Sequence, residues 1–148
     1  MPPQGKTLLR NRWLQKLAPP KIWTTTKGKF LRPVILESPY RGKNTAGMAR
    51  NIRYTRLCCR EAFLRYAEVP FASHLLYPQM LDEFTVVERR LGIQGNFIWT
   101  DFCQSVVVYI DLGMSPGMQL AVDNATAKKK EIIIRNLYKP WLALVKEN

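Results

Sequence analysis

The chain has 148 residues and a formal net charge of +12, because 23 Lys and Arg outnumber 11 Asp and Glu. This length favours one domain, and a hydrophobic content of 47% excludes a wholly disordered chain. No apolar run approaches the roughly 18 residues of a membrane-spanning helix, so an integral membrane protein is not expected. Three Cys and one His provide neither a disulfide framework nor a metal-ligand spacing, and no metal site is predicted.

The positive charge is concentrated at the N-terminus. Residues 1–33 carry eight basic and no acidic side chains (+8), whereas residues 34–148 carry 15 basic and 11 acidic ones (+4). Within this basic extension, the spacing of Leu9, Trp13 and Leu17 predicts an amphipathic helix over 7–17. Such a segment is typical of a mitochondrial transit peptide, of an arm that contacts nucleic acid, anionic membrane or an acidic protein, or of a solubilising tail.

Beyond the extension, strand and helix patterns alternate four times. Apolar runs of strand length lie at 34–37, 69–72, 105–110 and 132–134. Helical patterns follow them at 44–66, 85–102, 115–129 and 138–145. Two of these helices begin with a recognisable cap, since Thr85 and Glu88 have capping-box spacing and Ser115 precedes a proline.

This alternation predicts an α/β fold, a doubly wound parallel sheet of about four to five strands with right-handed crossovers. The predicted organisation is a basic extension (1–33), an α/β domain (34–137) and a short C-terminal tail (138–148). Ligands of such sheets bind at the carboxyl ends of the strands. The segments expected to converge there are 37–42, 73–77 and 111–118.

The first two of these segments contain several candidate ligand-binding side chains. Ser38, Tyr40 and Arg41 follow the first strand, where they either bind a phosphate or a base or form a proline-containing turn. His74 follows the second strand and either contacts a ligand, pairs with Glu37 or acts as a structural hydrogen-bonding group.

The remaining candidates lie near the third strand and the helix before it. Asp111 ends the most apolar strand and is expected to face the crevice, unless it only forms a turn. The helix N-terminus that follows is a candidate anion site, formed by Ser115, Gly117 and Met118. Glu88 is first a capping residue and second a candidate catalytic acid.

Four motifs occur in the order expected for one family. They are Glu-Ser-Pro-Tyr-Arg-Gly at 37–42, Ala-Ser-His-Leu-Leu-Tyr at 72–77, Glu-Arg-Arg-Leu-Gly-Ile at 88–93 and Tyr-Ile-Asp-Leu-Gly-Met-Ser-Pro-Gly-Met at 109–118. With these motifs, residues 34–137 resemble the nucleoside 2-deoxyribosyltransferase-like superfamily. More narrowly, they resemble an uncharacterised branch met in bacteria and phages.

The resemblance implies a flavodoxin-like domain whose active members cleave the N-glycosidic bond of a nucleoside or nucleotide. In that family a Glu early in the helix after the third strand attacks the sugar carbon, and an acid near the strand end assists. A carboxylate suits this role because it can trap an oxocarbenium-like transition state covalently.

The nucleophile of the family lies three residues after a Gly-Met pair, and Ala121 occupies this position here. A second acidic position of many relatives is Gln104. A two-residue shift of the alignment would offer Asp123 instead. Since alanine cannot attack, the sequence favours a non-catalytic protein, and Asp111, Asp123 and Glu88 are the catalytic candidates if it is active.

Three functions are consistent with these observations. The first is an accessory or structural subunit of a mitochondrial respiratory complex or mitochondrial ribosome, fastened through residues 1–33 to protein subunits, RNA or anionic lipid. The second is a stand-alone protein that senses or sequesters a nucleotide. The third is an active N-glycosidase or deoxyribosyltransferase that uses Asp123, Asp111 or Glu37. None requires a cofactor, a bound nucleotide is the candidate ligand, and the expected location is mitochondrial or otherwise cytoplasmic.

Overall fold

Four parallel strands form the centre of the structure, a computed structural model that describes residues 30–146. The strands are β1 (Arg32–Glu37), β2 (Glu68–Phe71), β3 (Ser105–Tyr109) and β4 (Glu131–Arg135). They are ordered β2-β1-β3-β4 and every neighbouring pair is parallel. This is the flavodoxin-like order, in which the chain direction across the sheet reverses between β1 and β3.

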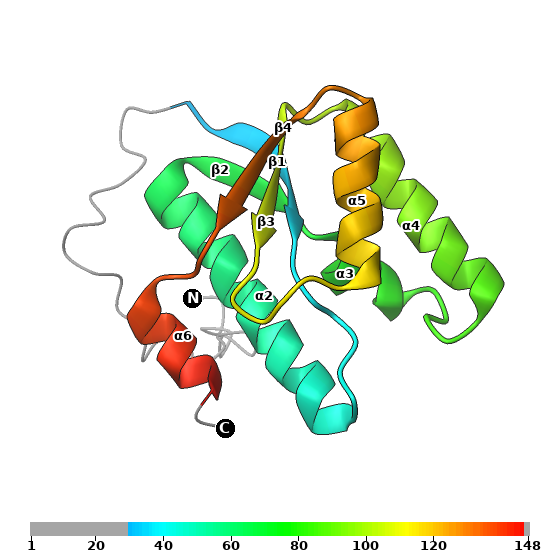
Figure 1. Ribbon diagram of the computed structural model, residues 1–148, viewed down its shortest axis with the longest axis horizontal. Coiled ribbons are helices and arrows are strands. Elements are labelled where there is room, and N and C mark those ends of the chain that lie inside the picture. Colours follow the sequence, from blue (N-terminus) through cyan, green and yellow to red (C-terminus); the bar gives the residue numbers. More distant parts are fainter. Residues whose placement is uncertain (1–29, 147–148) are drawn as a thin grey trace, which may run out of the picture.

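Helices cover both faces of this sheet. They are α2 (Thr45–Tyr66), α3 (Ser73–Leu76), α4 (Val86–Asp101), α5 (Pro116–Ala127) and α6 (Lys139–Lys146), with a 3₁₀ turn, η1 (Tyr77–Gln79), after α3. Figure 1 shows α2 and α6 on one face and α4 and α5 on the other. Among residues 30–146, no helix is both long and apolar enough to cross a membrane.

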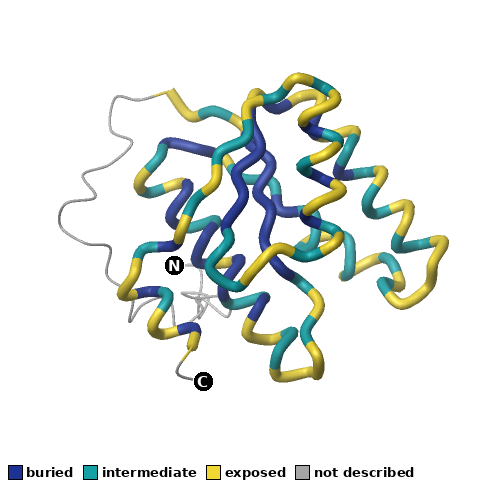
Figure 2. Tube along the Cα trace, in the orientation of Figure 1, coloured by how far each residue is buried: buried dark blue, intermediate teal, exposed yellow. Residues whose placement is uncertain are grey.

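The two central strands, β1 and β3, are largely buried on both sides, whereas the edge strands β2 and β4 are only partly buried, as Figure 2 shows. Alternate strand residues contribute to two hydrophobic cores, because successive side chains of a strand point to opposite faces. Val34, Leu36, Val107 and Tyr109 pack with residues of α2 and α6. Ile35, Val106 and Val108 pack on the other face with residues of α5. A strand that is covered on both faces must be apolar throughout, which explains the uninterrupted apolar run of β3.

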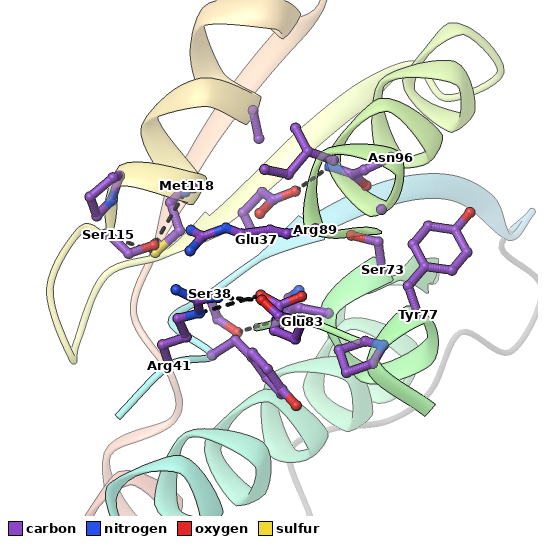
Figure 3. A pocket seen from close by; sticks show the side chains of 18 of the residues that line it. Glu37, Ser38, Arg41, Ser73, Tyr77, Glu83, Arg89, Asn96, Ser115 and Met118 are labelled. Atoms are coloured by element: carbon purple, nitrogen blue, oxygen red, sulfur yellow. Dashed lines mark hydrogen bonds and ion pairs between the residues drawn. The ribbon is translucent and has the colours of Figure 1, made fainter. Parts of the chain in front are cut away.

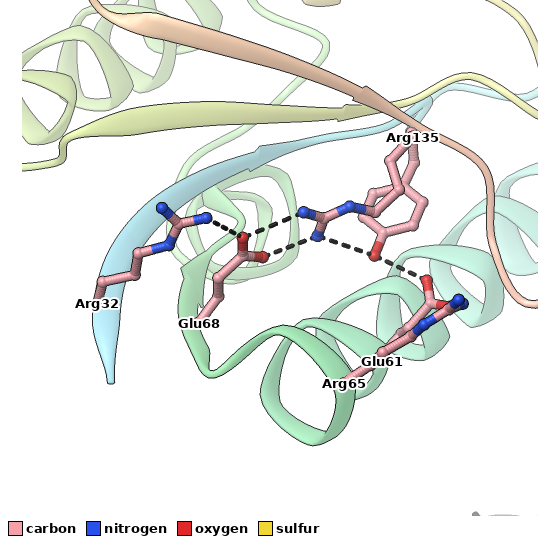
Figure 4. A network of polar contacts seen from close by, with 6 residues as sticks. Arg32, Glu61, Arg65, Glu68 and Arg135 are labelled. Atoms are coloured by element: carbon pink, nitrogen blue, oxygen red, sulfur yellow. Dashed lines mark hydrogen bonds and ion pairs between the residues drawn. The ribbon is translucent and has the colours of Figure 1, made fainter. Parts of the chain in front are cut away.

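The sheet and α2 also enclose two carboxylates (Figure 4). Glu68 on β2 is fully buried and receives hydrogen bonds from Arg135 of β4 (2.8 and 3.1 Å) and from Arg32 of β1 (3.0 Å). Glu61 of α2, equally buried, accepts hydrogen bonds from the Tyr109 hydroxyl (2.9 Å) and the backbone N–H of Tyr138 (3.1 Å). These hydrogen bonds connect residues of all four strands and of α2 with the start of the C-terminal segment.

The fold predicted from the sequence is confirmed. The four predicted strands are present with shifts of one or two residues at their ends, and α2 begins directly after Asn44, whose side chain accepts the backbone N–H of Gly47 (2.8 Å). The predicted C-terminal helix is α6, which packs against α2. The helix predicted over 7–17 lies outside the described residues.

The buried face of α2 differs from the face that apolar spacing predicts. By helical spacing, the apolar side chains of Met48, Ile52, Cys59 and Phe63 are the ones expected to face the core, yet none of them is fully buried and Phe63 is exposed. The buried side instead combines apolar and polar residues: Asn51, Tyr54, Thr55, Leu57, Cys58, Glu61 and Ala62. The polar members are buried because each meets a specific hydrogen-bond partner, which a hydrophobicity pattern cannot register.

Candidate functional site

A cavity of about 370 Å³ lies at the carboxyl ends of β1 and β3 (Figure 3). Its walls come from the segment after β1, from α3 and η1, from one face of α4 and from the first turns of α5. This is the reversal point of the sheet, where the loops after neighbouring strands diverge and leave a crevice. The expected convergence of the segments after β1 and β2 and before α5 is therefore observed.

The floor of the cavity carries a buried polar pair. The side-chain amide of Asn96 donates a hydrogen bond to Glu37 Oε1 (2.8 Å), and both residues are at least nine-tenths buried. Burial raises the pKa of the Glu37 carboxyl to about 8, although the hydrogen bond from Asn96 opposes the shift. Asn96 Oδ1 is buried without a hydrogen-bond partner among the described residues. The pair therefore presents a neutral carboxylic acid and an amide acceptor at pH 7.

His74 belongs to a second polar group on the wall. Its Nε2 lies 2.8 Å from Ser38 Oγ and 3.3 Å from Thr55 Oγ1, and the two hydroxyl oxygens are 2.6 Å apart. Thr55 donates its proton to the carbonyl of Asn51 (2.9 Å), so Ser38 donates to Thr55 and the Nε2–H of His74 donates to Ser38. Burial lowers the pKa of His74 to about 4, which keeps the ring neutral. The alternative pairing of His74 with Glu37 does not occur.

Two arginines give the cavity its charge. Arg41 makes an ion pair with Glu83 (3.6 Å), donates to the carbonyl of the same residue and lies over the ring of Phe84. Arg89 of α4 lines the cavity, and no acidic side chain among residues 30–146 lies within ion-pair distance of it. In Figure 3 its side chain extends across the cavity toward Ser115 and Met118.

The first turn of α5 forms the opposite wall. Ser115 caps this helix by accepting the N–H of Met118 (3.2 Å), and Pro116 occupies the first helical position, as the sequence predicts. Gly117 and Met118 line the cavity, and so does Ala121 one turn further along. The position that the resemblance assigns to a nucleophile therefore faces the cavity, but it carries only a methyl group.

Three predicted catalytic candidates do not line the cavity. The Asp111 carboxylate accepts hydrogen bonds from the Tyr54 hydroxyl (2.6 Å) and the N–H of Leu137 (2.9 Å), so it joins α2 to the segment after β4. Asp123 is exposed on α5 and accepts a hydrogen bond from Gln119 (2.8 Å). Glu88 accepts the N–H of Asp82, which explains why only one half of the predicted capping box forms.

The remaining predicted residues do meet at one place. Glu37, Ser38, Tyr40, Arg41, His74, Ser115, Gly117 and Met118 all line the same cavity. The sequence prediction missed the wall contributed by α4, which includes Arg89, Ile93 and Asn96. These positions recur at spacings of four and three residues and so share one helical face. Arg89 and Ile93 lie in the 88–93 motif, but the sequence analysis took only Glu88 of this motif as a candidate functional residue.

The described residues contain no group of three or more His, Cys, Asp or Glu side chains placed to hold a metal ion. The titratable side chains that line the cavity are two glutamates, two arginines, two tyrosines and a neutral histidine. Such a set suits the recognition of a polar, anionic small molecule.

Comparison with known proteins yields one family. A family model described as "Domain of unknown function (DUF7768)" matches residues 32–135. No curated protein matches the chain, and no solved structure matches it. The matched stretch begins at the first residue of β1 and ends at the last residue of β4, so it contains the whole sheet and every cavity residue. Because the match covers more than half of the sequence, the chain belongs to the DUF7768 family.

Proposed function

We propose that this domain binds a nucleotide in the cavity at the carboxyl edge of the sheet and leaves its N-glycosidic bond intact. The observation that carries the proposal is the position of Ala121. It lines the same cavity as the buried Glu37–Asn96 pair, so the cavity has polar walls while the position expected for a nucleophile carries only a methyl group.

The chemistry of the walls supports a nucleotide. Arg89 offers positive charge and Gly117, in the first turn of α5, offers a backbone N–H donor, and both suit a phosphate. Glu37 and Asn96 offer a donor and a free acceptor for a sugar hydroxyl or a base edge. Tyr40 and Tyr77 add aromatic rings that can contact a base. A cavity of about 370 Å³ is within the range of small-molecule sites.

The carboxyl groups of the cavity also favour binding over cleavage. Covalent attack on a sugar carbon needs an ionised, accessible carboxylate. Glu37 is protonated at neutral pH because its burial raises the pKa, and Glu83 is engaged by Arg41. Asp123, the alternative nucleophile, lies on the exposed side of α5.

Calorimetric titration of the full chain with nucleoside 5′-monophosphates tests binding. We expect Arg89→Gln to weaken binding at least about tenfold, since it removes a charge-assisted hydrogen bond to the phosphate. Arg90→Gln is the matched control, because the neighbouring Arg90 does not line the cavity. Absence of heat with every nucleotide, or equal effects of both substitutions, would refute the proposal.

A second proposal concerns the setting in which the domain works. The charge of +8 in residues 1–33 supports an accessory subunit of a larger assembly, such as a mitochondrial respiratory complex or ribosome. Chemical cross-linking of the native particle tests this role. Cross-links from lysines of this segment to another protein would support it, whereas a protein isolated alone from its cell would oppose it.

A further inference from the structure

Helix α4 exposes a stripe of apolar residues, interrupted at its centre by Gln94, on the side that faces away from the cavity. It consists of Val87, Leu91 and Ile98 of the helix and of Phe102, the residue that caps its C-terminus, and their exposed fractions are 70%, 53%, 61% and 71%. At about 100° per residue, these four positions lie within about 60° of one another around the helix, and they extend over roughly 22 Å of its length. Figure 1 places α4 at the outer edge of the described part of the chain, where no helix or strand of residues 30–146 lies beyond it.

Such a stripe is unusual for the exposed side of a peripheral helix. Single exposed apolar side chains are common, but a contiguous apolar surface on a soluble domain marks an interaction site. The stripe contains no charged residue, although the sequence as a whole carries +12. The stripe itself therefore places no like charges opposite each other when two copies meet, although Lys128 and Lys130 lie beside its C-terminal end.

The order of residues along α4 makes the stripe complementary to itself. When two copies of a helix pack antiparallel about a two-fold axis, positions equidistant from the centre meet. The centre of 87–102 lies between Gln94 and Gly95, so Val87 meets Phe102 and Leu91 meets Ile98 of the other copy. Gln94 lies within the stripe beside the axis, and a glutamine amide can donate to and accept from a second copy of itself.

The charges that border the stripe are arranged in the same way. Arg90 and Asp101 lie on the same flank of α4, near opposite ends of the stripe. In an antiparallel pair the same flanks meet, which brings Arg90 of each copy near Asp101 of the other. Both side chains are exposed, and Asp101 remains half-exposed although Lys128 binds one of its oxygens (2.7 Å).

We propose that the α4 stripe is a homodimer interface, in which two copies of the chain pack their α4 helices antiparallel around Gln94. The interface lies on the side of α4 opposite Asn96 and Arg89, so it leaves the mouth of the cavity to the ligand. This proposal does not depend on the identity of that ligand.

Sedimentation of the full chain across a range of concentrations tests the interface. We expect a monomer–dimer equilibrium that Ile98→Glu weakens at least about tenfold, because the dimer would bury an unpaired carboxylate. Phe63→Glu on α2 is the matched control, since Phe63 is also exposed but lies on the opposite face of the sheet. Circular dichroism of each variant excludes unfolding as the cause.

A second variant tests the position of the axis. Gln94→Glu places two carboxylates beside each other, so its dimer should dissociate at neutral pH and re-form near pH 4, where carboxyl groups take up protons. The proposal is overturned by a chain that is monomeric at every concentration, and by a dimer that both substitutions leave intact. It is equally overturned if the stripe binds lipid vesicles or residues 1–29 of the same chain as a monomer.

Discussion

Glu37 shows how burial alone changes the chemistry of a side chain. Its pKa is raised to about 8 in the folded protein, against 4.5 for an unperturbed carboxyl, so folding favours the protonated form. The contribution of Glu37 to stability is therefore complete below pH 4.5 and is lost as the pH rises to about 8. Since each pKa unit corresponds to about 1.4 kcal/mol, the change amounts to several kcal/mol.

We expect Glu37→Gln to remove this pH dependence. Glutamine keeps the hydrogen bond from Asn96 and cannot ionise, so the variant should match the wild type near pH 5 and exceed its stability above pH 8. Urea unfolding at a series of pH values measures this difference. Glu131→Gln, at an exposed glutamate of β4, is the control and should change nothing. A constant difference between wild type and Glu37→Gln across the pH range would contradict the account.

Glu68 is a second residue whose burial determines how much stability its substitution costs. It is fully buried between Arg135 and Arg32. Glu68→Gln should destabilise the protein by about 3–5 kcal/mol, because it leaves the largely buried Arg135 without its counter-charge. Arg32→Gln, at a half-exposed guanidinium, should cost only about 1 kcal/mol or less. Similar losses in urea unfolding for the two variants would show that burial is not the cause.

At the scale of elements, the end of α5 contains strain that can be relieved. Lys129 follows the helix with φ of 56°, a left-handed conformation that costs a non-glycine residue roughly 1–2 kcal/mol. Lys129→Gly should therefore stabilise the protein by about 1 kcal/mol, as measured by urea unfolding. Lys129→Ala removes the same exposed side chain but keeps Cβ, so it should have little effect. Equal changes in the free energy of unfolding for Lys129→Gly and Lys129→Ala would refute the claim that the backbone of Lys129 is strained.

Elements also explain what could be predicted from the sequence. The central strands were predictable because a strand that is buried on both faces must be apolar. The starts of α4 and α5 were predictable because Thr85 and Ser115 are helix-capping residues. The cavity residues after β1 and β2 followed from topology, since parallel strands end at one edge.

Other features of the structure could not be predicted, because they depend on how helices pack on the sheet and on contacts between residues distant in sequence. The apolar spacing of α2 did not identify its buried face, because Asn51, Thr55 and Glu61 are buried with hydrogen-bond partners. Asp111 was expected in the crevice, yet Tyr54 and Leu137 engage it from positions 57 and 26 residues away. The contribution of α4 to the cavity required knowing how that helix lies on the sheet.

At the scale of the whole molecule, the charge and the cavity belong to different parts of the chain. Eight of the twelve net positive charges lie in residues 1–33, while the cavity combines Arg89 and an Arg41–Glu83 pair with neutral groups. The net charge therefore gives no measure of what the cavity binds. The cavity and the α4 stripe occupy opposite sides of one helix, so ligand and partner would not compete.

Ala121 and Ala127 provide a matched pair of positions for testing whether the cavity binds a nucleotide without cleaving it. Both lie on α5, but Ala121 lines the cavity and Ala127 is exposed. Leucine is well tolerated in helices, so Ala121→Leu should fill part of the cavity without unfolding the protein, and Ala127→Leu should change nothing at the site.

Proton magnetic resonance of a nucleoside 5′-monophosphate mixed with the full chain tests binding and cleavage together. The account predicts saturation transfer from the protein to the nucleotide, loss of this transfer in Ala121→Leu, its retention in Ala127→Leu, and an anomeric proton signal that stays unchanged during prolonged incubation. It is contradicted if no nucleotide shows transfer, if Ala121→Leu leaves the transfer intact, or if the signals of a free base appear.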